Sequence, residues 1–474
     1  MANKDKFKSK WGFILASLGM AIGTGNIWRF PRVVSQNGGG VFVIPWIMGL
    51  FLWALPLVFL EYSIGQTHRK GVVAVFQDIF SKRQGWIGGF VAAVTGGIMF
   101  YYSVVTGWAL FYTLSSILKT SGFLAPDKLW SWFQSSPYPL IFHLLAILAV
   151  AYILSKGVSG GIEKATRIMI PTLFMLLVFS AIRAVTLPHG IKGLDFLFYP
   201  DFGKLFHHRI WLEALTQAAW STGAGWGLIL TYSIYARKKE DGFTNSLVVV
   251  FGDYSASILA AITVVSTIFA FYPDPLQADR ILSAGNTGLT FIWIPKLFSK
   301  MPLNWLFAFI FFAALFLAAL SSLISLAELE VRVMIDFGLT RRKAVLILAF
   351  IGFIFGIPSA LSLNFLNNQD WVWGLALLVN GVIFSAALWK IGEKFKDYVS
   401  NTTRFNVGKY VNFVVKYIVP LEFVVLLIWW FSSAMKGKWY DPFSTYSLAT
   451  VMLQWFLVAS GLFIIFNIIY RNRK

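Results

Sequence analysis

The chain has 474 residues, of which 57% are hydrophobic and only 13% carry charge, whereas soluble domains carry about a quarter charged residues. This composition excludes a water-soluble globule and indicates an integral membrane protein with room for about a dozen spanning helices. The lack of cysteine excludes disulfides, thiolate metal sites and a cysteine nucleophile. The net charge of +19 is attributed to basic cytoplasmic loops rather than to a nucleic-acid surface.

Runs of apolar residues predict twelve membrane-spanning helices after a polar, lysine-rich cytoplasmic segment at 1–10. The expected spans are 11–34, 41–66, 87–118, 138–155, 166–186, 210–235, 244–271, 303–335, 342–359, 371–391, 409–434 and 445–470. Basic clusters such as 69–70, 237–239 and 341–343 fall in alternate loops. We therefore expect a multi-pass protein of the cell membrane, in a bacterium the inner membrane, with both termini in the cytoplasm. The outer loop 272–302 is expected to be ordered and to contain short helices.

The first span is interrupted by the sequence GMAIGTGNIWRFP at 19–31, which holds three glycines, Asn26 and Arg29. Close helix packing through small residues would explain the glycines. It explains the asparagine and the arginine poorly, because polar groups inside a membrane are costly and need partners. The pattern therefore favours a broken helix at a binding site.

The sixth span is interrupted in the same way by WSTGAGWG at 220–227. Broken helices at matching places in two halves of a transporter indicate a binding site near the membrane midplane, between inverted repeats. An unwound helix frees carbonyl groups that can bind a small cation and N–H groups that can bind a carboxylate. One interruption can therefore serve an ion and an anionic substrate group together.

The eighth span contains AALSSLIS, in which Ala318, Ser321 and Ser322 have helical spacings of three and four residues and share one face. Serine hydroxyls and a carbonyl on one face could complete a sodium shell, although hydrogen bonding between helices is an equally good explanation. Three carboxylates in otherwise apolar spans, Asp253, Glu61 and Glu328, mark either function or structural hubs.

Arg29 lies at the outer end of the interruption in the first span, and Asp370 lies at the start of the tenth span. These two residues could pair across a vestibule.

These motifs resemble the neurotransmitter:sodium symporter family, and specifically its bacterial amino-acid transporters of the leucine-transporter type. The resemblance covers nearly the whole chain, and its motifs are GFILASLGMAIGTGNIWRFP, NGGGVFVIPW, FYYSVVTGW, TQAAWSTGAGWG, LSSLISLAE and NNQDWVWG. It implies an all-α fold of twelve transmembrane helices built as a five-plus-five inverted repeat with broken helices 1 and 6. The repeats would be 11–186 and 210–391, followed by helices 11 and 12 at 409–470.

The resemblance also implies two sodium sites, and we carry their ligands over position by position. Site one would use Ala21, Asn26, Ser221 and Asp253, with the substrate carboxylate as a further ligand. Site two would use the backbone carbonyls of Gly19, Ile22 and Ala318 with the hydroxyls of Ser321 and Ser322.

The implied substrate site lies between the sodium sites, with the carboxylate at Thr24, Gly25 and the hydroxyl of Tyr102. The full set of implied substrate-binding residues is Met20, Ala21, Thr24, Gly25, Ile98, Tyr102, Trp220, Ser221, Gly223, Ala224, Trp226, Ser322, Ser325 and Leu326. The implied outer gate is Arg29, Asp370, Tyr102 and Trp220. The implied inner gate is Lys4, Phe7, Tyr235 and Asp336.

Three departures from the family pattern are informative. Gly23 stands where monoamine transporters carry an aspartate, which favours a substrate that brings its own carboxylate. Asp253 stands where many members have asparagine. Gln217, Ser221 and Ser257 match chloride-ligand positions, but Trp46 replaces the usual tyrosine. A fixed carboxylate at Asp253 would supply the negative charge that chloride supplies elsewhere, so we expect no chloride requirement; the same carboxylate could also accept a proton.

The sequence thus predicts a sodium-coupled symporter that imports neutral, hydrophobic or aromatic amino acids. A transporter of the same fold for a nucleoside, a betaine-like osmolyte or taurine is the alternative, because two tryptophans could stack on a ring or surround a quaternary ammonium. A membrane enzyme is disfavoured, since the five histidines form no metal-spacing motif with carboxylates. The expected partners are a small-molecule substrate and the lipid bilayer, with no nucleic acid and no obligate protein partner.

Overall fold

The computed structural model describes residues 6–118, 125–237, 240–435 and 438–470, and these residues contain helices and turns but no strand. The α-helices in chain order are α1 (Lys10–Ala21), α2 (Phe30–Gln36), α3 (Gly40–Gly49), α4 (Leu55–His68), α5 (Val72–Ile79), α6 (Gly85–Ile117), α7 (Pro126–Ser135), α8 (Tyr138–Ser155), α9 (Glu163–Val185), α10 (Ile191–Phe198), α11 (His208–Ser221), α12 (Leu228–Ser233), α13 (Gly242–Phe271), α14 (Pro275–Leu282), α15 (Gly285–Gly288), α16 (Ile294–Phe298), α17 (Asn304–Asp336), α18 (Arg341–Leu361), α19 (Leu363–Thr402), α20 (Gly408–Phe413), α21 (Val419–Ala434) and α22 (Leu448–Tyr470).

Several of these helices are continued by π-helical turns. The turns are η1 (Gly25–Arg29), η2 (Leu50–Ala54), η5 (Val158–Ile162), η7 (Leu289–Trp293) and η8 (Val414–Ile418). The turn η2 joins α3 to α4, η5 leads into α9, and η8 joins α20 to α21, so that each combination forms one long apolar segment.

Within the described residues, ten helical segments are long and apolar enough to cross a membrane. The predicted first and sixth spans are not among these ten, because both are broken. The α1 helix has 12 residues and α11 has 14, which is shorter than the roughly 20 residues that cross a bilayer. The all-helical membrane fold with two broken helices is therefore confirmed.

Each break has a local cause. After α1 the chain is extended at Ile22, and the Asn26 side chain accepts the N–H of Gly23 at 2.8 Å. Between α11 and α12, Gly223, Gly225 and Gly227 have φ angles of +70°, +84° and +78°, which glycine adopts far more readily than other residues. Three left-handed residues in such a short stretch cannot continue an α-helix.

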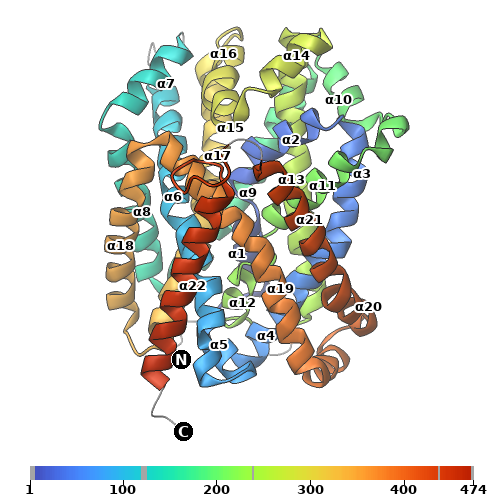
Figure 1. The fold of residues 1–474 in the computed structure, drawn as a ribbon. Coiled ribbons are helices and arrows are strands. Elements are labelled where there is room, and N and C mark those ends of the chain that lie inside the picture. The colour runs from blue at the N-terminus through green and yellow to red at the C-terminus, as the bar shows by residue number, and fades with distance from the viewer. Residues whose placement is uncertain (1–5, 119–124, 238–239, 436–437, 471–474) are drawn as a thin grey trace.

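Figure 1 shows α1 and α12 in the middle of the bundle, with α18 and α20 towards its sides. The helices α7, α14 and α16 lie at one end of the bundle, which we name the α14 end. The helix α5 and the last turn of α22 lie at the other, which we name the α5 end. The segment 272–302 forms α14, α15, η7 and α16, which confirms the prediction of an ordered loop with short helices.

Two predicted helix boundaries were wrong. The span predicted at 371–391 is α19, which runs from Leu363 to Thr402, so Asp370 lies inside the helix rather than at its start. The span predicted at 166–186 begins at Val158. Hydropathy locates the apolar part of a helix, whereas its end depends on caps and contacts. The start of α19, for example, is capped by Ser362, whose hydroxyl accepts the N–H of Phe365.

Candidate functional site

A cavity lies where the two interruptions face each other, walled by α1 with η1, α6, the α11–α12 break, α17 and α19. Its lining residues are Met20, Ala21, Gly23, Thr24, Gly25, Asn26, Trp28, Arg29, Ile98, Tyr101, Tyr102, Val105, Trp220, Ser221, Gly223, Trp226, Leu228, Asn286, Ser322, Leu326 and Asp370. The walls are largely apolar, and the charged groups among them are Arg29 and Asp370, which also line the vestibule above.

Twelve of the fourteen residues expected to bind substrate line this cavity, and Ala224 and Ser325 do not. Ala224 is buried, and the hydroxyl of Ser325 donates to the Ser322 carbonyl at 2.7 Å. Five lining residues were missed, namely Trp28, Tyr101, Val105, Leu228 and Asn286. For Tyr101 and Val105 the signal was present, because they follow Ile98 on α6 at three and seven residues and so lie on its cavity-facing side.

One end of the cavity is suited to a carboxylate. The N–H of Thr24 donates to the hydroxyl of Tyr102 at 2.8 Å, across 78 residues of sequence. A side chain at the adjacent Gly25 would meet no heavy atom within 4 Å, so the backbone there is open to the cavity. A hydroxyl and freed N–H groups beside a half-helix are the donors that an anionic group requires.

The hydroxyls of Tyr102 and Ser322 leave no room for a side chain at Gly23. A Cβ atom built on Gly23 would lie 2.6 Å from the Tyr102 hydroxyl and 3.0 Å from the Ser322 hydroxyl. An aspartate at this position would therefore have to displace one of the two. The site has no fixed acid at the position where an amine-binding aspartate would stand.

Three of the four residues assigned to sodium site one, Asn26, Ser221 and Asp253, come together around the Asn26 amide, while Ala21 lines the adjacent cavity. The amide nitrogen donates to Asp253 Oδ1 at 2.7 Å and to the hydroxyls of Ser257 at 2.8 Å and Ser221 at 3.2 Å. It also donates to the Asp253 carbonyl at 3.2 Å. Four oxygens thus converge on one point, which is the donor set that a hard cation prefers. A sodium ion at this point requires the Asn26 amide to turn its oxygen inwards.

The residues assigned to sodium site two also come together. The Ser322 hydroxyl lies among three carbonyls of the first interruption, at 3.0 Å from Ile22, 3.2 Å from Gly19 and 3.4 Å from Met20. The Ser321 hydroxyl donates to the Ala318 carbonyl at 3.0 Å. The break in α1 therefore presents oxygens to α17 within a buried space, and the residues fit a sodium ion.

At the chloride-ligand positions, some side chains already have hydrogen-bond partners and others have none. The hydroxyl of Ser221 donates to Asp253 Oδ2 at 2.8 Å, and Ser257 accepts from Asn26. The Trp46 ring stacks on Tyr254 with 3.8 Å between ring centroids. Gln217 is buried, and its amide has no hydrogen-bond partner among the described residues. The negative charge next to these residues is that of the Asp253 carboxylate.

The other two buried carboxylates have structural partners. Glu61 on α4 accepts the N–H of Gly225 at 2.5 Å and so holds the unwound segment of the sixth span. Glu328 on α17 accepts the Tyr235 hydroxyl at 2.7 Å and two nitrogens of Arg341 at 2.7 and 2.8 Å.

At the α14 end, Arg29 and Asp370 line the same cavity, but no ion pair joins them in the described part of the chain. The guanidinium of Arg29 instead lies 4.4 Å from the centroid of the Trp220 ring. Trp220 lines both the substrate cavity and the wider vestibule above it. Arg29, Trp220 and Asp370 thus all lie where the two spaces meet.

At the α5 end, three of the four residues assigned to the inner gate lie within the described part of the chain. Asp336 pairs with Arg332 at 2.5 Å and accepts the N–H of Gly71 at 2.5 Å, while Lys4 lies outside the described residues. Phe7 is buried, and its N–H donates to the Tyr235 carbonyl at 3.3 Å. The rings of Phe7 and Tyr235 make an edge contact, with 6.5 Å between their centroids.

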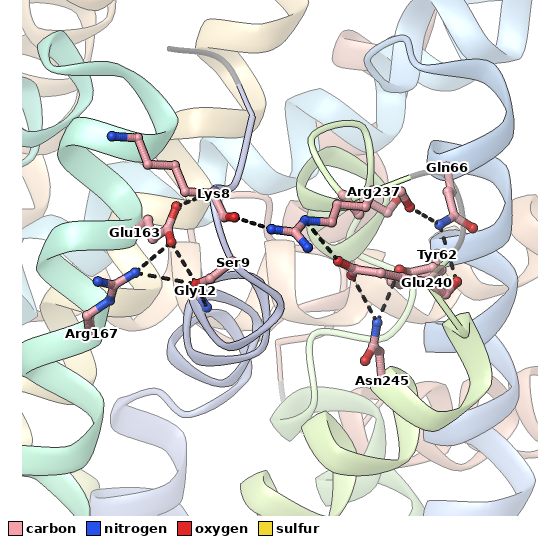
Figure 2. Close-up of polar contacts among 12 residues, drawn as sticks. Lys8, Ser9, Gly12, Tyr62, Gln66, Glu163, Arg167, Arg237, Glu240 and Asn245 are labelled. Atoms are coloured by element: carbon pink, nitrogen blue, oxygen red, sulfur yellow. Dashed lines mark hydrogen bonds and ion pairs between the residues drawn. The ribbon is translucent and has the colours of Figure 1, made fainter. Parts of the chain in front are cut away.

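The chain before α1 is held from two sides, as Figure 2 shows. On one side the buried carboxylate of Glu163 accepts the N–H of Lys8 at 2.8 Å, the hydroxyl of Ser9 at 3.0 Å and Arg167 at 2.8 Å. On the other side Arg237 donates to the Lys8 carbonyl. Both contacts to Lys8 use its backbone. We call Glu163 and Arg237, acting on the Lys8 backbone, the N-terminal clamp.

The Arg237 side of the clamp is continued by Glu240, 4.0 Å away, which accepts Asn245 at 3.4 Å. Burial raises the pKa of Glu240, and the nearby Arg237 opposes that rise. Gln66 on α4 donates to the Arg237 carbonyl at 2.7 Å and is drawn beside it in Figure 2. The clamp thus joins α9, α4 and the end of the sixth span to the start of α1.

Removing the acid of this clamp should open the α5 end. Because the chain has no cysteine, the single reporter Ala236→Cys, at a buried position below the cavity, gives a clean labelling site. Glu163→Ala should raise its rate of labelling by a water-soluble maleimide about tenfold or more, the effect of losing about 1.4 kcal/mol from the closed state. Glu393→Ala, which removes an exposed ion pair with Lys396, is the control and should leave the rate unchanged. Equal rates for both variants would contradict the clamp.

Comparison with known proteins places these features in a family. The family model described as "Sodium:neurotransmitter symporter family" matches residues 4–132 and 133–474. An uncharacterized sodium-dependent transporter of Methanocaldococcus jannaschii is 33% identical over 440 residues, which cover 88% of each chain. The sodium-dependent serotonin transporter of Drosophila melanogaster is 23% identical and is matched over 99% of this chain and 84% of its own length.

Among solved structures, the crystal structure of MhsT in complex with L-phenylalanine is similar, with a TM-score of 0.78 and 30% sequence identity. The match covers 90% of this chain and 99% of that chain.

Proposed function

The chain belongs to the sodium:neurotransmitter symporter family and is a sodium-dependent transporter rather than an enzyme, and from this premise we propose that it imports neutral, hydrophobic or aromatic amino acids. The observation that carries the proposal is the cavity itself. The Tyr102 hydroxyl accepts the Thr24 N–H and keeps its own O–H to donate to a substrate carboxylate, and the cavity surrounds the rest of a substrate with apolar walls.

Coupling to sodium follows from shared residues. Asn26 and Ser221 belong to both the cavity lining and the oxygen cluster of site one. Ser322 likewise lines the cavity and reaches the carbonyls of site two. A substrate carboxylate bound next to site one would complete the shell of an ion there, so each ligand would strengthen binding of the other.

The proposed cycle is alternating access between the repeats 11–186 and 210–391. The protein would lie in a bacterial inner membrane with the α5 end in the cytoplasm, because that end carries the basic residues Lys70, Arg237 and Arg341. Trp220 and Arg29 would gate the outer side, and Phe7, Tyr235 and the N-terminal clamp would gate the inner side.

The direct test is a binding screen on the purified protein, with the standard amino acids and a panel of nucleosides, taurine and betaine-like osmolytes in sodium, potassium and choline media. We expect sodium-dependent binding of several hydrophobic and aromatic amino acids, because discrimination of one CH₂ group contributes only about 1 kcal/mol. Sodium-dependent binding of a nucleoside, taurine or an osmolyte in preference to all amino acids would overturn the proposed substrate class.

We further propose that transport does not require chloride. The Ser221 hydroxyl already donates to Asp253 Oδ2, so a carboxylate fills the role of an anion beside site one. Sodium-driven uptake should remain within about twofold when gluconate replaces chloride, since the attraction of about 4 kcal/mol between a carboxylate and an ion about 4 Å away is already present. A large loss of uptake in gluconate would show that the unpartnered amide of Gln217 serves an anion after all.

A further inference from the structure

The Trp220 indole contacts two residues, Arg29 and Gly374, and the proposed function does not account for both contacts. Its face lies 4.4 Å from the Arg29 guanidinium. Its edge lies against Gly374 of α19: a Cβ atom added to Gly374 would overlap Cζ2 and Cη2 of the indole and lie 2.9 Å from Cε2. The ring therefore rests directly on the helix backbone.

Gly374 is not required by the backbone conformation. It lies inside α19 and is not among the glycines with positive φ. A glycine in the interior of a helix destabilises it by roughly 0.5–1 kcal/mol relative to alanine. Such a glycine needs a packing reason, and the ring of Trp220 supplies it, because any larger residue would occupy the volume that the indole fills.

The same face of α19 carries the other outer-gate residue. Asp370 precedes Gly374 by four residues, so the two lie one turn apart on one side of the helix. Asp370 lines the cavity and the vestibule with Arg29 and Trp220. This face of α19 is thus the surface against which the aromatic lid lies.

We propose that Gly374 is a positioning residue for substrate binding: it lets the Trp220 lid lie against α19 and so sets how tightly the lid covers the bound substrate. This inference rests on the proposed function, since Trp220 acts as a lid only if substrate binds beneath it. The atoms that would collide are those of the outer indole ring, which a phenylalanine at position 220 would lack.

The experiment is a double-variant cycle of Gly374→Ala and Trp220→Phe, read out as sodium-dependent amino-acid affinity and dissociation rate on purified protein. In the background of Trp220, Gly374→Ala should weaken affinity by about tenfold or more and speed dissociation, as overpacking of a filled site does. In the Trp220→Phe background, the same change should alter affinity by no more than about threefold, because the colliding atoms are gone.

Gly97→Ala is the matched control. A Cβ atom at Gly97 of α6 would lie 2.7 Å from the Trp373 ring, so it creates the same kind of overlap against α19 at a different tryptophan. Any defect that it causes should persist undiminished in the Trp220→Phe background. Rescue of Gly97→Ala by Trp220→Phe would show a general loosening of the bundle and would overturn the specific role of Gly374.

The outcomes separate the inference from the proposed function. If the unmodified protein binds no amino acid in sodium, the proposed function fails. If it binds, and Gly374→Ala has no effect or has the same effect in both backgrounds, the positioning role fails. If Gly374→Ala alone does not fold, the double variant with Trp220→Phe should still fold and bind, and its failure to do so would also contradict the proposal.

Discussion

Asp253→Asn is expected to make sodium binding depend on chloride. The carboxylate accepts both the Asn26 amide and the Ser221 hydroxyl and supplies the negative charge of site one. Its attraction for an ion about 4 Å away is of order 4 kcal/mol at an effective dielectric constant near 20. In gluconate medium, the sodium concentration for half-maximal substrate binding should therefore rise by about tenfold or more.

Chloride should restore part of that loss. An asparagine at position 253 adds an N–H donor next to Ser221, Ser257 and the unpartnered amide of Gln217, which together suit an anion. Asp201→Asn, which neutralises an exposed carboxylate paired with Lys204, is the control and should behave like the unmodified protein in both media. Unchanged sodium dependence of Asp253→Asn in gluconate would remove Asp253 from site one.

Ser322→Ala is expected to weaken the second sodium site. The hydroxyl lies among the carbonyls of Gly19, Met20 and Ile22, and alanine keeps the helix while removing one oxygen ligand. The sodium concentration for half-maximal binding should rise by about tenfold or more, the effect of losing about 1.4 kcal/mol of ion binding. Much of the substrate affinity should return at saturating sodium.

The control for this variant is another buried serine on a spanning helix. The Ser116 hydroxyl of α6 donates to the Tyr112 carbonyl at 2.6 Å, away from the cavity and from both oxygen clusters. Ser116→Ala should leave the sodium dependence unchanged. If Ser322→Ala shows the sodium dependence of Ser116→Ala, the assignment of site two to the Gly19–Ser322 contact is wrong.

The breaks in the first and sixth spans could be predicted because their residues conflict with an uninterrupted membrane helix. Glycines, such as Gly223 and Gly225 with their left-handed φ angles, and a buried asparagine are unfavourable in an uninterrupted membrane helix. Both breaks can therefore be recognised from the residue types alone. The grouping of Ala318, Ser321 and Ser322 followed from helical spacing alone. Resemblance then identified which carbonyls of the first break face these serines, and the structure brings those groups within hydrogen-bond distance.

Other features depend on contacts between distant segments, which spacing cannot predict. Glu163 reaches Lys8 across 155 residues, and its sequence neighbours give no sign of this partner. Asp336 pairs with Arg332 on its own helix, a partner that the resemblance did not indicate. Gly374 looks like an ordinary small residue in a membrane helix until the Trp220 ring is placed against it.

The most direct test of sodium-coupled recognition of an amino-acid carboxylate is a titration of L-phenylalanine binding to the purified protein at constant ionic strength, with sodium exchanged against choline. Phenethylamine, which has the same ring and amine but no carboxylate, is measured alongside. We expect phenylalanine to bind in sodium at least about tenfold more tightly than in choline, and phenethylamine to show no sodium-dependent binding. Equal binding of phenylalanine in both media, or sodium-dependent binding of phenethylamine with equal affinity, would contradict this account.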